Sequence, residues 1–102
     1  MRSLVELRAT DNQLTEIPDS IGQLSQLREL HLRNNQLRTL PASIAGLSDL
    51  RQIDLRGNPI DRLPESIETM PKLEKIDLRW VSTLTAPAWL DEMEARGCLV
   101  YR

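Results

Sequence analysis

The chain has 102 residues, of which 27% are charged and 3% aromatic, and its formal net charge at pH 7 is −2. This weakly acidic balance argues against nucleic acid as a main partner, because phosphate recognition requires a concentration of Lys and Arg. The sequence also contains no apolar run long enough to span a membrane and no signal-peptide core near its N-terminus.

The chain is organised as a repeat of 23 residues, which is clearest in the segment 27–49. There, Leu30 and Leu32 are two apart, as on a strand with one buried face. Pro41 and Ile44 are three apart, as on a helical turn that begins with proline. The pattern predicts repeats at about 4–26, 27–49, 50–72 and 73–95.

A single repeat of this kind cannot fold alone. It offers about seven apolar side chains, and burying each one contributes roughly 1.5–3 kcal/mol. Ordering the unit costs on the order of 1.5 kcal/mol per residue, which consumes that gain. Stacked repeats bury each apolar set against the next set and pair their strand edges, so the repeats are expected to form one continuous domain over residues 1–102.

An asparagine stands at the ninth position of the first three repeats, as Asn12, Asn35 and Asn58, and the fourth repeat has Val81 there. An amide side chain carries two donor hydrogens and an acceptor oxygen, so it can bond the turns of two neighbouring repeats. We therefore interpret the asparagines as a structural ladder that ends in the fourth repeat, and not as a binding site.

These residues resemble the leucine-rich repeat family, in its 23-residue, Ras-suppressor-like class whose repeat ends LPxxIxxLxx, a class that also occurs in bacteria. The resemblance extends from Leu4 to about Met93. It implies an α/β solenoid, in which a right-handed array has a concave parallel β-sheet of about five strands and short helical or 3-10 segments on its convex side. It also implies a protein-protein interaction module, since the family binds diverse partners through its variable positions.

The first repeat carries no polar capping segment before Leu4, although terminal repeats usually need one. Its apolar side chains at Leu4, Leu7 and Leu14 would then lie beside an unpaired strand edge. Either the chain was cut from a longer array or another molecule covers this end. We expect a homodimer that forms through the N-terminal edge.

The polar positions between the buried leucines are expected to face the concave side in three columns. The first column is Arg8, His31, Asp54, Asp77 and Val100, the second is Thr10, Arg33, Arg56, Arg79 and Arg102, and the third is Glu6, Glu29, Gln52, Lys75 and Cys98. Neighbouring strands lie about 4.8 Å apart, so the second column predicts a row of four arginines. Each of the two aspartates precedes an arginine by two residues on the same face, so ion pairing is available.

Two interpretations of this face are open. The columns are either a network of ion pairs exposed to solvent, or a surface that recognises an acidic or mixed-charge protein. In the same way, Trp80 either packs under a widened turn or serves as an aromatic anchor for a partner. The second interpretation predicts a partner-binding site composed of His31, Arg33, Asp54, Arg56, Asp77, Arg79 and Trp80.

The sequence predicts no catalytic site, no metal site and no cofactor. His31 and Cys98 fall on the second and fifth strands, roughly 14 Å apart at about 4.8 Å per strand, which is too far for a nucleophilic pair. One histidine and one cysteine do not form a cluster of metal ligands. An alternative function is a substrate-recognition segment of a larger, effector-like protein whose catalytic domain lies outside this chain.

The last repeat is expected to end in a helix and a closing strand. Residues 87–96 have helical spacing, and Gly97 is a typical C-terminal stop. In the 23-residue frame, Leu99 and Tyr101 fall on buried positions, so residues 98–102 are predicted to form a fifth strand that closes the core. The single cysteine excludes an internal disulfide and suits a reducing compartment, so we expect the cytoplasm, with secretion as an effector left open.

Overall fold

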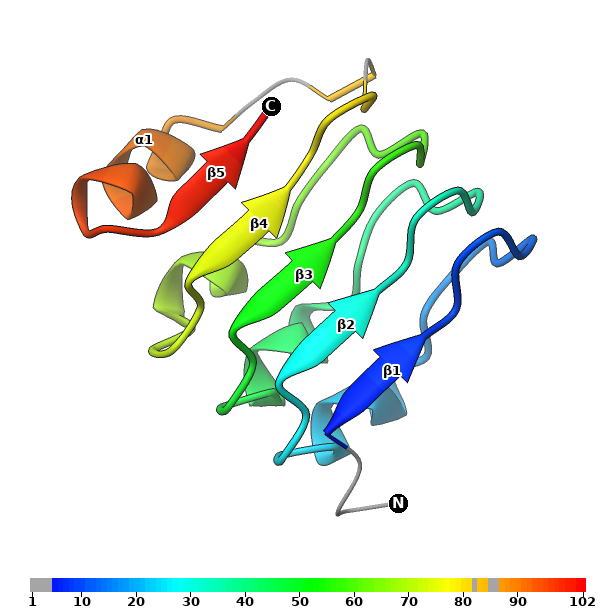
Figure 1. Cartoon of the computed structure of the whole chain (residues 1–102), viewed down its shortest axis with the longest axis horizontal. Helices are drawn as coiled ribbons and strands as arrows, with labels where there is room; N and C mark the ends of the chain where they lie inside the picture. Colours follow the sequence, from blue (N-terminus) through cyan, green and yellow to red (C-terminus); the bar gives the residue numbers. More distant parts are fainter. Residues whose placement is uncertain (1–4, 82, 85–86) are drawn as a thin grey trace.

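The computed structural model describes residues 5–81, 83–84 and 87–102 (Figure 1). Five short strands form one sheet in sequential order, and every neighbouring pair is parallel. The strands are β1 (Glu6–Arg8), β2 (Glu29–His31), β3 (Gln52–Asp54), β4 (Lys75–Asp77) and β5 (Leu99–Tyr101). This arrangement confirms the predicted parallel sheet of five strands.

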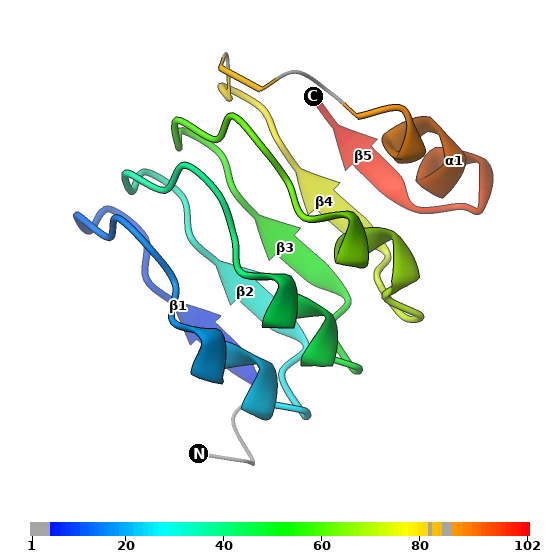
Figure 2. The same ribbon diagram turned by 180° about the vertical axis from the view of Figure 1, so that it is seen from behind.

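Short helical segments cover one face of the sheet, as seen from behind in Figure 2. They are the 3-10 helices η1 (Asp19–Gln23), η2 (Ala42–Gly46) and η3 (Glu65–Thr69) and the α-helix α1 (Trp89–Ala95). Each 3-10 helix follows a proline with extended backbone, because the proline ring fixes φ and has no amide hydrogen to leave unpaired. The predicted solenoid with helical segments on one side is therefore confirmed.

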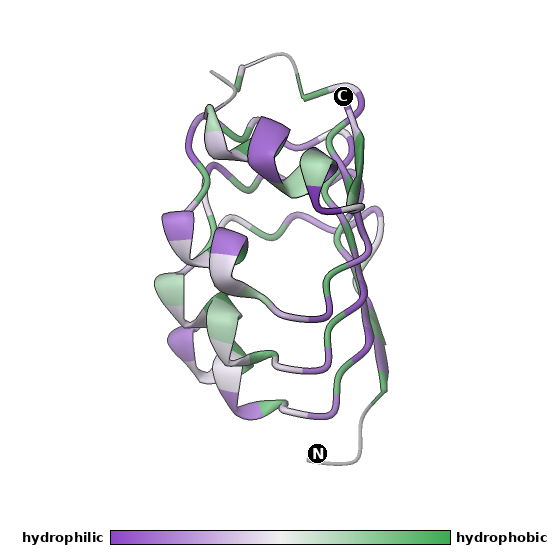
Figure 3. Cartoon of the chain, turned by 90° about the vertical axis from the view of Figure 1, so that its left-hand side faces the viewer, coloured by the Kyte–Doolittle hydropathy of each residue, from purple (hydrophilic) through white to green (hydrophobic). Residues whose placement is uncertain are grey.

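The hydrophobic core lies between these two layers, which Figure 3 shows edge-on. Leu30, Ile53 and Ile76 stand at equivalent positions of neighbouring strands, and each is at most 2% exposed. From β1 to β4 the paired residues are 23 positions apart, so each leucine or isoleucine meets its counterpart in the next turn. None of the helices in the described ranges combines the length and apolar character that a bilayer crossing requires.

The last step of the sheet is 24 residues and not 23, since Lys75 pairs with Leu99. Val100 therefore follows Ile76 toward the core, while Leu99 is 55% exposed and Tyr101 is 38% exposed. The prediction that Leu99 and Tyr101 enter the core is wrong. The physical reason is that α1 replaces the 3-10 turn of the earlier repeats, and the return segment is one residue longer.

The same shift removes three residues from the predicted columns, of which Val100 turns toward the core. Cys98 is buried and does not follow Lys75 on the open face. Arg102 donates to the carboxylates of Asp91 and Glu94 on α1, so it does not join the arginine row. That row contains three arginines and not four.

Asn35 and Asn58 connect consecutive repeats, as predicted for a structural ladder. The Asn58 amide nitrogen donates to the carbonyls of Leu32 (2.8 Å) and Leu55 (3.0 Å), and its oxygen accepts the Leu37 amide (3.2 Å). Asn35 makes the equivalent bonds one repeat earlier, and both side chains are buried. Each amide thus satisfies backbone groups that would otherwise be buried without partners.

The ladder differs at its two ends. Asn12 is exposed, and among the described residues its amide donates only to the Thr10 carbonyl, at 3.3 Å. In the fourth repeat Val81 has no polar side chain, and the Thr83 hydroxyl donates instead to the Ile60 carbonyl at 2.7 Å. The bridging function of the asparagines is therefore confined to the middle of the array.

We expect Asn58→Ala to lower the free energy of unfolding by at least about 2 kcal/mol, because each buried polar group left without a partner costs about 1–3 kcal/mol. Asn12→Ala is the matched control and should change it by less than about 0.5 kcal/mol, as for a surface substitution. Urea unfolding monitored by circular dichroism measures both. Equal losses in the two variants would contradict the ladder.

Candidate functional site

The face of the sheet that points away from the helical segments, called the concave face below, carries most of the predicted site residues. Side chains alternate along a strand, so the residues on either side of each buried Leu or Ile project to this face. Its members are Glu6, Arg8, Glu29, His31, Arg33, Gln52, Asp54, Arg56, Lys75, Asp77, Arg79, Leu99 and Tyr101.

Four of these residues form one continuous network of ion pairs. Arg56 binds Asp54 through two nitrogens, at 2.6 and 2.9 Å, and Arg79 binds Asp77 at 2.7 and 3.0 Å. Each aspartate also accepts the backbone amide of its own arginine, at 3.1 Å. Arg56 Nε lies 3.4 Å from Asp77, which joins the two pairs.

The network is ionised at neutral pH. Burial is the largest influence on the pKa of Asp54 and Asp77, and it opposes ionisation. The hydrogen bonds and positive charges of Arg56 and Arg79 together outweigh burial, so both pKa values lie below the ordinary aspartate value of 3.8. Two of the three arginines in the row are thus satisfied within the protein.

Arg33 stands in the same row but has no such partner. The residue two places before it is His31, and the His31 imidazole lies 3.1 Å from Glu29 and 3.8 Å from Glu6. Among the described residues no carboxylate pairs with Arg33, and its Nε is buried without a hydrogen-bond acceptor. An unsatisfied buried donor costs about 1–3 kcal/mol, so Arg33, unlike Arg56 and Arg79, is not satisfied within the described part of the protein.

Trp80 follows the arginine row in a left-handed backbone conformation, with φ of 62°. The equivalent residues of the earlier repeats are Asp11, Asn34 and Gly57, which have the same sign of φ. Asp, Asn and Gly tolerate this conformation, whereas for a bulky side chain it costs about 1–2 kcal/mol. The strain is thus specific to the fourth repeat.

The Trp80 ring is also exposed, at 69% of its surface. The expectation that it packs under the turn is wrong, since the guanidinium of Arg56 lies 5.8 Å from the ring centroid and leaves most of the ring open. Neither backbone preference nor burial favours a tryptophan at this position. Its role in the fold is therefore small.

Sequence reasoning missed Tyr101 and Leu99 as members of the concave face. The Tyr101 ring has the Lys75 ammonium at 5.2 Å and the Arg79 guanidinium at 5.3 Å from its centroid. The feature that could have revealed them in the sequence is the longer helical segment of the fourth repeat. It adds one residue before the last strand, and both side chains therefore turn outward. One end of the face thus combines exposed aromatic rings with cations.

The structure also brings together a group that the sequence did not reveal. Glu6, Glu29 and His31 offer ligand atoms within 4.8 Å of one another, a set that could hold a metal ion. These groups already have partners, because Arg8 binds Glu6 at 2.7 Å and His31 bonds Glu29. The hydrogen bond from Arg8 also lowers the pKa of Glu6. We interpret the group as a local ion-pair cluster.

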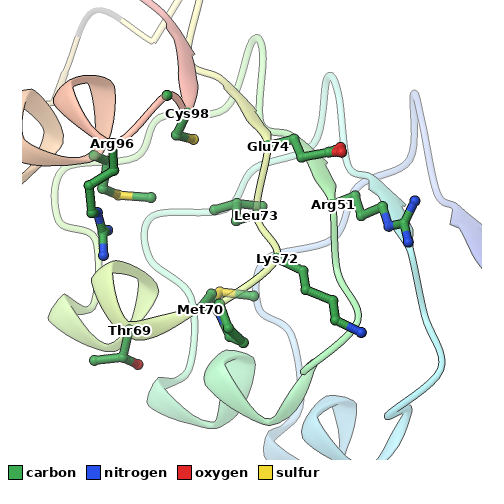
Figure 4. A pocket seen from close by; sticks show the side chains of 11 residues that line it. Arg51, Thr69, Met70, Lys72, Leu73, Glu74, Arg96 and Cys98 are labelled. Atoms are coloured by element: carbon green, nitrogen blue, oxygen red, sulfur yellow. The ribbon is translucent and has the colours of Figure 1, made fainter.

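A cleft of about 580 Å³ lies between the turn before β4 and the junction of α1 with β5 (Figure 4). It opens where Gly97 takes the place of the leucine that precedes β2, β3 and β4 in the earlier repeats. Two of its cations are occupied: Lys72 pairs with Asp49 at 3.0 Å, and Arg96 donates to the Glu68 carbonyl at 2.9 Å.

Cys98 lines this cleft, whereas His31 lines a separate hollow of about 100 Å³ on the concave face. The two side chains therefore do not form a nucleophilic pair. Burial is the main cause that raises the pKa of the Cys98 thiol, which keeps it protonated and unreactive at neutral pH.

The sequence matches a family model described as leucine rich repeat over residues 2–60. Similar solved structures include a leucine-rich repeat protein of Leptospira interrogans, at 29% identity and a TM-score of 0.75 over 81% of this chain and 24% of that one. Internalin C2 of Listeria monocytogenes aligns at 24% identity and a TM-score of 0.78, over 95% of this chain and 41% of that one.

The leucine-rich repeat domain of the type III effector XopL aligns at 23% identity and a TM-score of 0.56, over 81% of this chain and 47% of that one. At these last two identities the likeness concerns the fold alone. The chain spans less than half the length of each of the three solved chains. No match was found among curated protein sequences.

Proposed function

The chain belongs to the leucine-rich repeat family, and on that premise we propose that it is a protein-protein interaction module that binds a partner on its concave face. Proteins of this family are typically interaction modules and not catalysts. The assignment to the 23-residue, Ras-suppressor-like class stays a prediction. The observation that carries the proposal is the exposure of Trp80 and Tyr101 beside cations on the concave face.

Exposed aromatic side chains are expensive to leave in water and dominate the energetics of protein interfaces. The Asp54–Arg56 and Asp77–Arg79 pairs hold the surface beneath them in a fixed geometry, which reduces the entropy that binding costs. The proposed partner site consists of His31, Arg33, Asp54, Arg56, Asp77, Arg79 and Trp80, now with Tyr101.

Site-specific photo-crosslinking in the native host tests this proposal. With benzoylphenylalanine in place of Tyr101, we expect one or more discrete protein adducts, because this position lies on the concave face. The matched control places the same group at Glu65, an exposed residue of η3 on the opposite side, where we expect no adduct. Adducts from Glu65 alone, or equal adducts from both positions, would rule out the concave face as the binding surface.

The alternative is a substrate-recognition segment of a larger protein whose catalytic domain lies outside these residues. What supports it is that the chain spans only part of each similar structure. We propose a bacterial source, since these structures come from bacteria, and a cytoplasmic location, which suits the free thiol of Cys98. The mass of the native gene product distinguishes a separate module from a segment.

We also propose that the N-terminal edge is covered by a second copy of the chain. Leu7 and Leu14 are only partly buried, whereas the equivalent Leu30 and Leu37 of the second repeat are fully buried. Leu4, the third residue of this predicted contact, lies outside the described residues. Two such edges meeting about a two-fold axis would cover both apolar ends.

Light scattering after size exclusion near micromolar concentration should give the mass of a dimer. Leu7→Glu should convert it to a folded monomer, because a carboxylate would be buried in the contact. Leu99→Glu, at the exposed start of β5, is the matched control and should leave the dimer intact. A monomer mass for the unmodified chain would end this proposal.

A further inference from the structure

We propose that the concave face binds a short acidic segment of its partner, in which a carboxylate and an apolar side chain are three residues apart. Arg33 binds the carboxylate and Trp80 binds the apolar side chain. The inference rests on the proposed function, since it names the feature of the partner protein that would occupy this face.

The carboxylate site follows from the comparison of three equivalent arginines. Arg56 and Arg79 each have an aspartate two residues before them and are satisfied by it through two nitrogens. At Arg33 the corresponding residue is His31, which bonds Glu29 instead. Within the described part of the chain no carboxylate pairs with the Arg33 guanidinium. Its Nε is buried, so a carboxylate of the partner would bind the terminal nitrogens, whose planar arrangement matches carboxylate geometry.

The apolar site follows from Trp80. Trp80 is both strained and exposed, so the fold gains little from it, and backbone strain of this kind concentrates at binding sites. Arg56 lies against the Trp80 ring, at 5.8 Å from its centroid, and is itself held by Asp54 and Asp77. The aromatic surface is thus presented in a defined orientation.

The spacing of the motif follows from the geometry of the sheet. Arg33 follows β2 and Trp80 follows β4, so two strand intervals of about 4.8 Å, or roughly 10 Å, separate them across the sheet. An extended peptide advances about 3.3 Å per residue, so three residues cover this distance. The segment therefore runs across the strands.

The charge between the two sites favours an acidic segment. Lys75 lies at the start of β4, the strand that precedes Trp80, and its ammonium contacts only the Tyr101 ring among the interactions of the described residues. The two aspartates nearby are neutralised by Arg56 and Arg79. Arg33 and Lys75 add two positive charges to this part of the face, against the one negative charge of Glu29, which bonds His31. The balance is positive, which attracts carboxylates and repels a basic segment.

The test uses fluorescein-labelled peptides in a Gly and Ser background that carry Glu-Gly-Ser-Phe or the reversed order Phe-Ser-Gly-Glu. One of the two orders should bind, with the Arg33 Nε–H and Trp80 indole signals shifting together in NMR spectra. Replacing Glu by Gln, replacing Phe by Ala, or placing the two residues adjacent should each weaken the peptide at least tenfold in fluorescence anisotropy.

On the protein, Arg33→Gln and Trp80→Gly should each weaken binding at least tenfold. The matched controls Arg62→Gln, at an exposed site away from the face, and Trp89→Phe, on α1, should stay within twofold. Trp80→Gly should also melt at a higher temperature than Trp80→Ala, because only glycine relieves the left-handed strain. This comparison separates a lost contact from a lost fold.

Binding that does not depend on the spacing, or on Arg33 and Trp80, would overturn the motif. Failure of both peptide orders at millimolar concentration would overturn it as well. If crosslinks from Tyr101 still appear in either case, the concave face remains the proposed binding surface and only the proposed peptide motif is rejected. If those crosslinks are missing too, the proposed function falls with it.

Discussion

The hydrogen bonds that join one repeat to the next are the interaction on which the whole molecule depends. No turn of the solenoid has enough apolar surface to fold alone, so each must satisfy its backbone through its neighbours. The parallel strands do so on one side, and the buried amides of Asn35 and Asn58 do so at the turns beyond them. This fixed stacking places equivalent side chains in straight rows across the concave face.

The departure from strict repetition in the fourth turn determines the character of that face. One extra residue and an α-helix rotate the final strand, which brings Tyr101 and Leu99 outward and turns Val100 inward. The same change opens the cleft at Gly97 and turns Arg102 toward α1. An array of identical repeats would have had a uniformly polar surface. The irregular end supplies the exposed aromatic rings.

The sequence predicted the regular part of the structure well, because a 23-residue period constrains strands, 3-10 turns and core residues together. The pairing of Arg56 and Arg79 with aspartates also followed from their spacing on a strand. The register of β5 was not predicted correctly, because a fixed 23-residue period does not allow for the single residue that is added before the last strand. The strain at Trp80, the isolation of Arg33 and the Glu6, Glu29 and His31 cluster depend on side-chain geometry that a pattern does not contain.

We propose that Arg33 and Trp80 bind a partner, because Asp54 and Asp77 already bind Arg56 and Arg79 within the protein. Titration of the Asp77 carboxyl carbon by NMR tests this most directly. Because the fold depresses its pKa, ionised Asp77 stabilises the protein above the unfolded value, and this contribution disappears as the pH falls through the folded value. We expect a midpoint below 3.8 that rises in Arg79→Gln. A midpoint at or above 3.8, unchanged by that substitution, would contradict it.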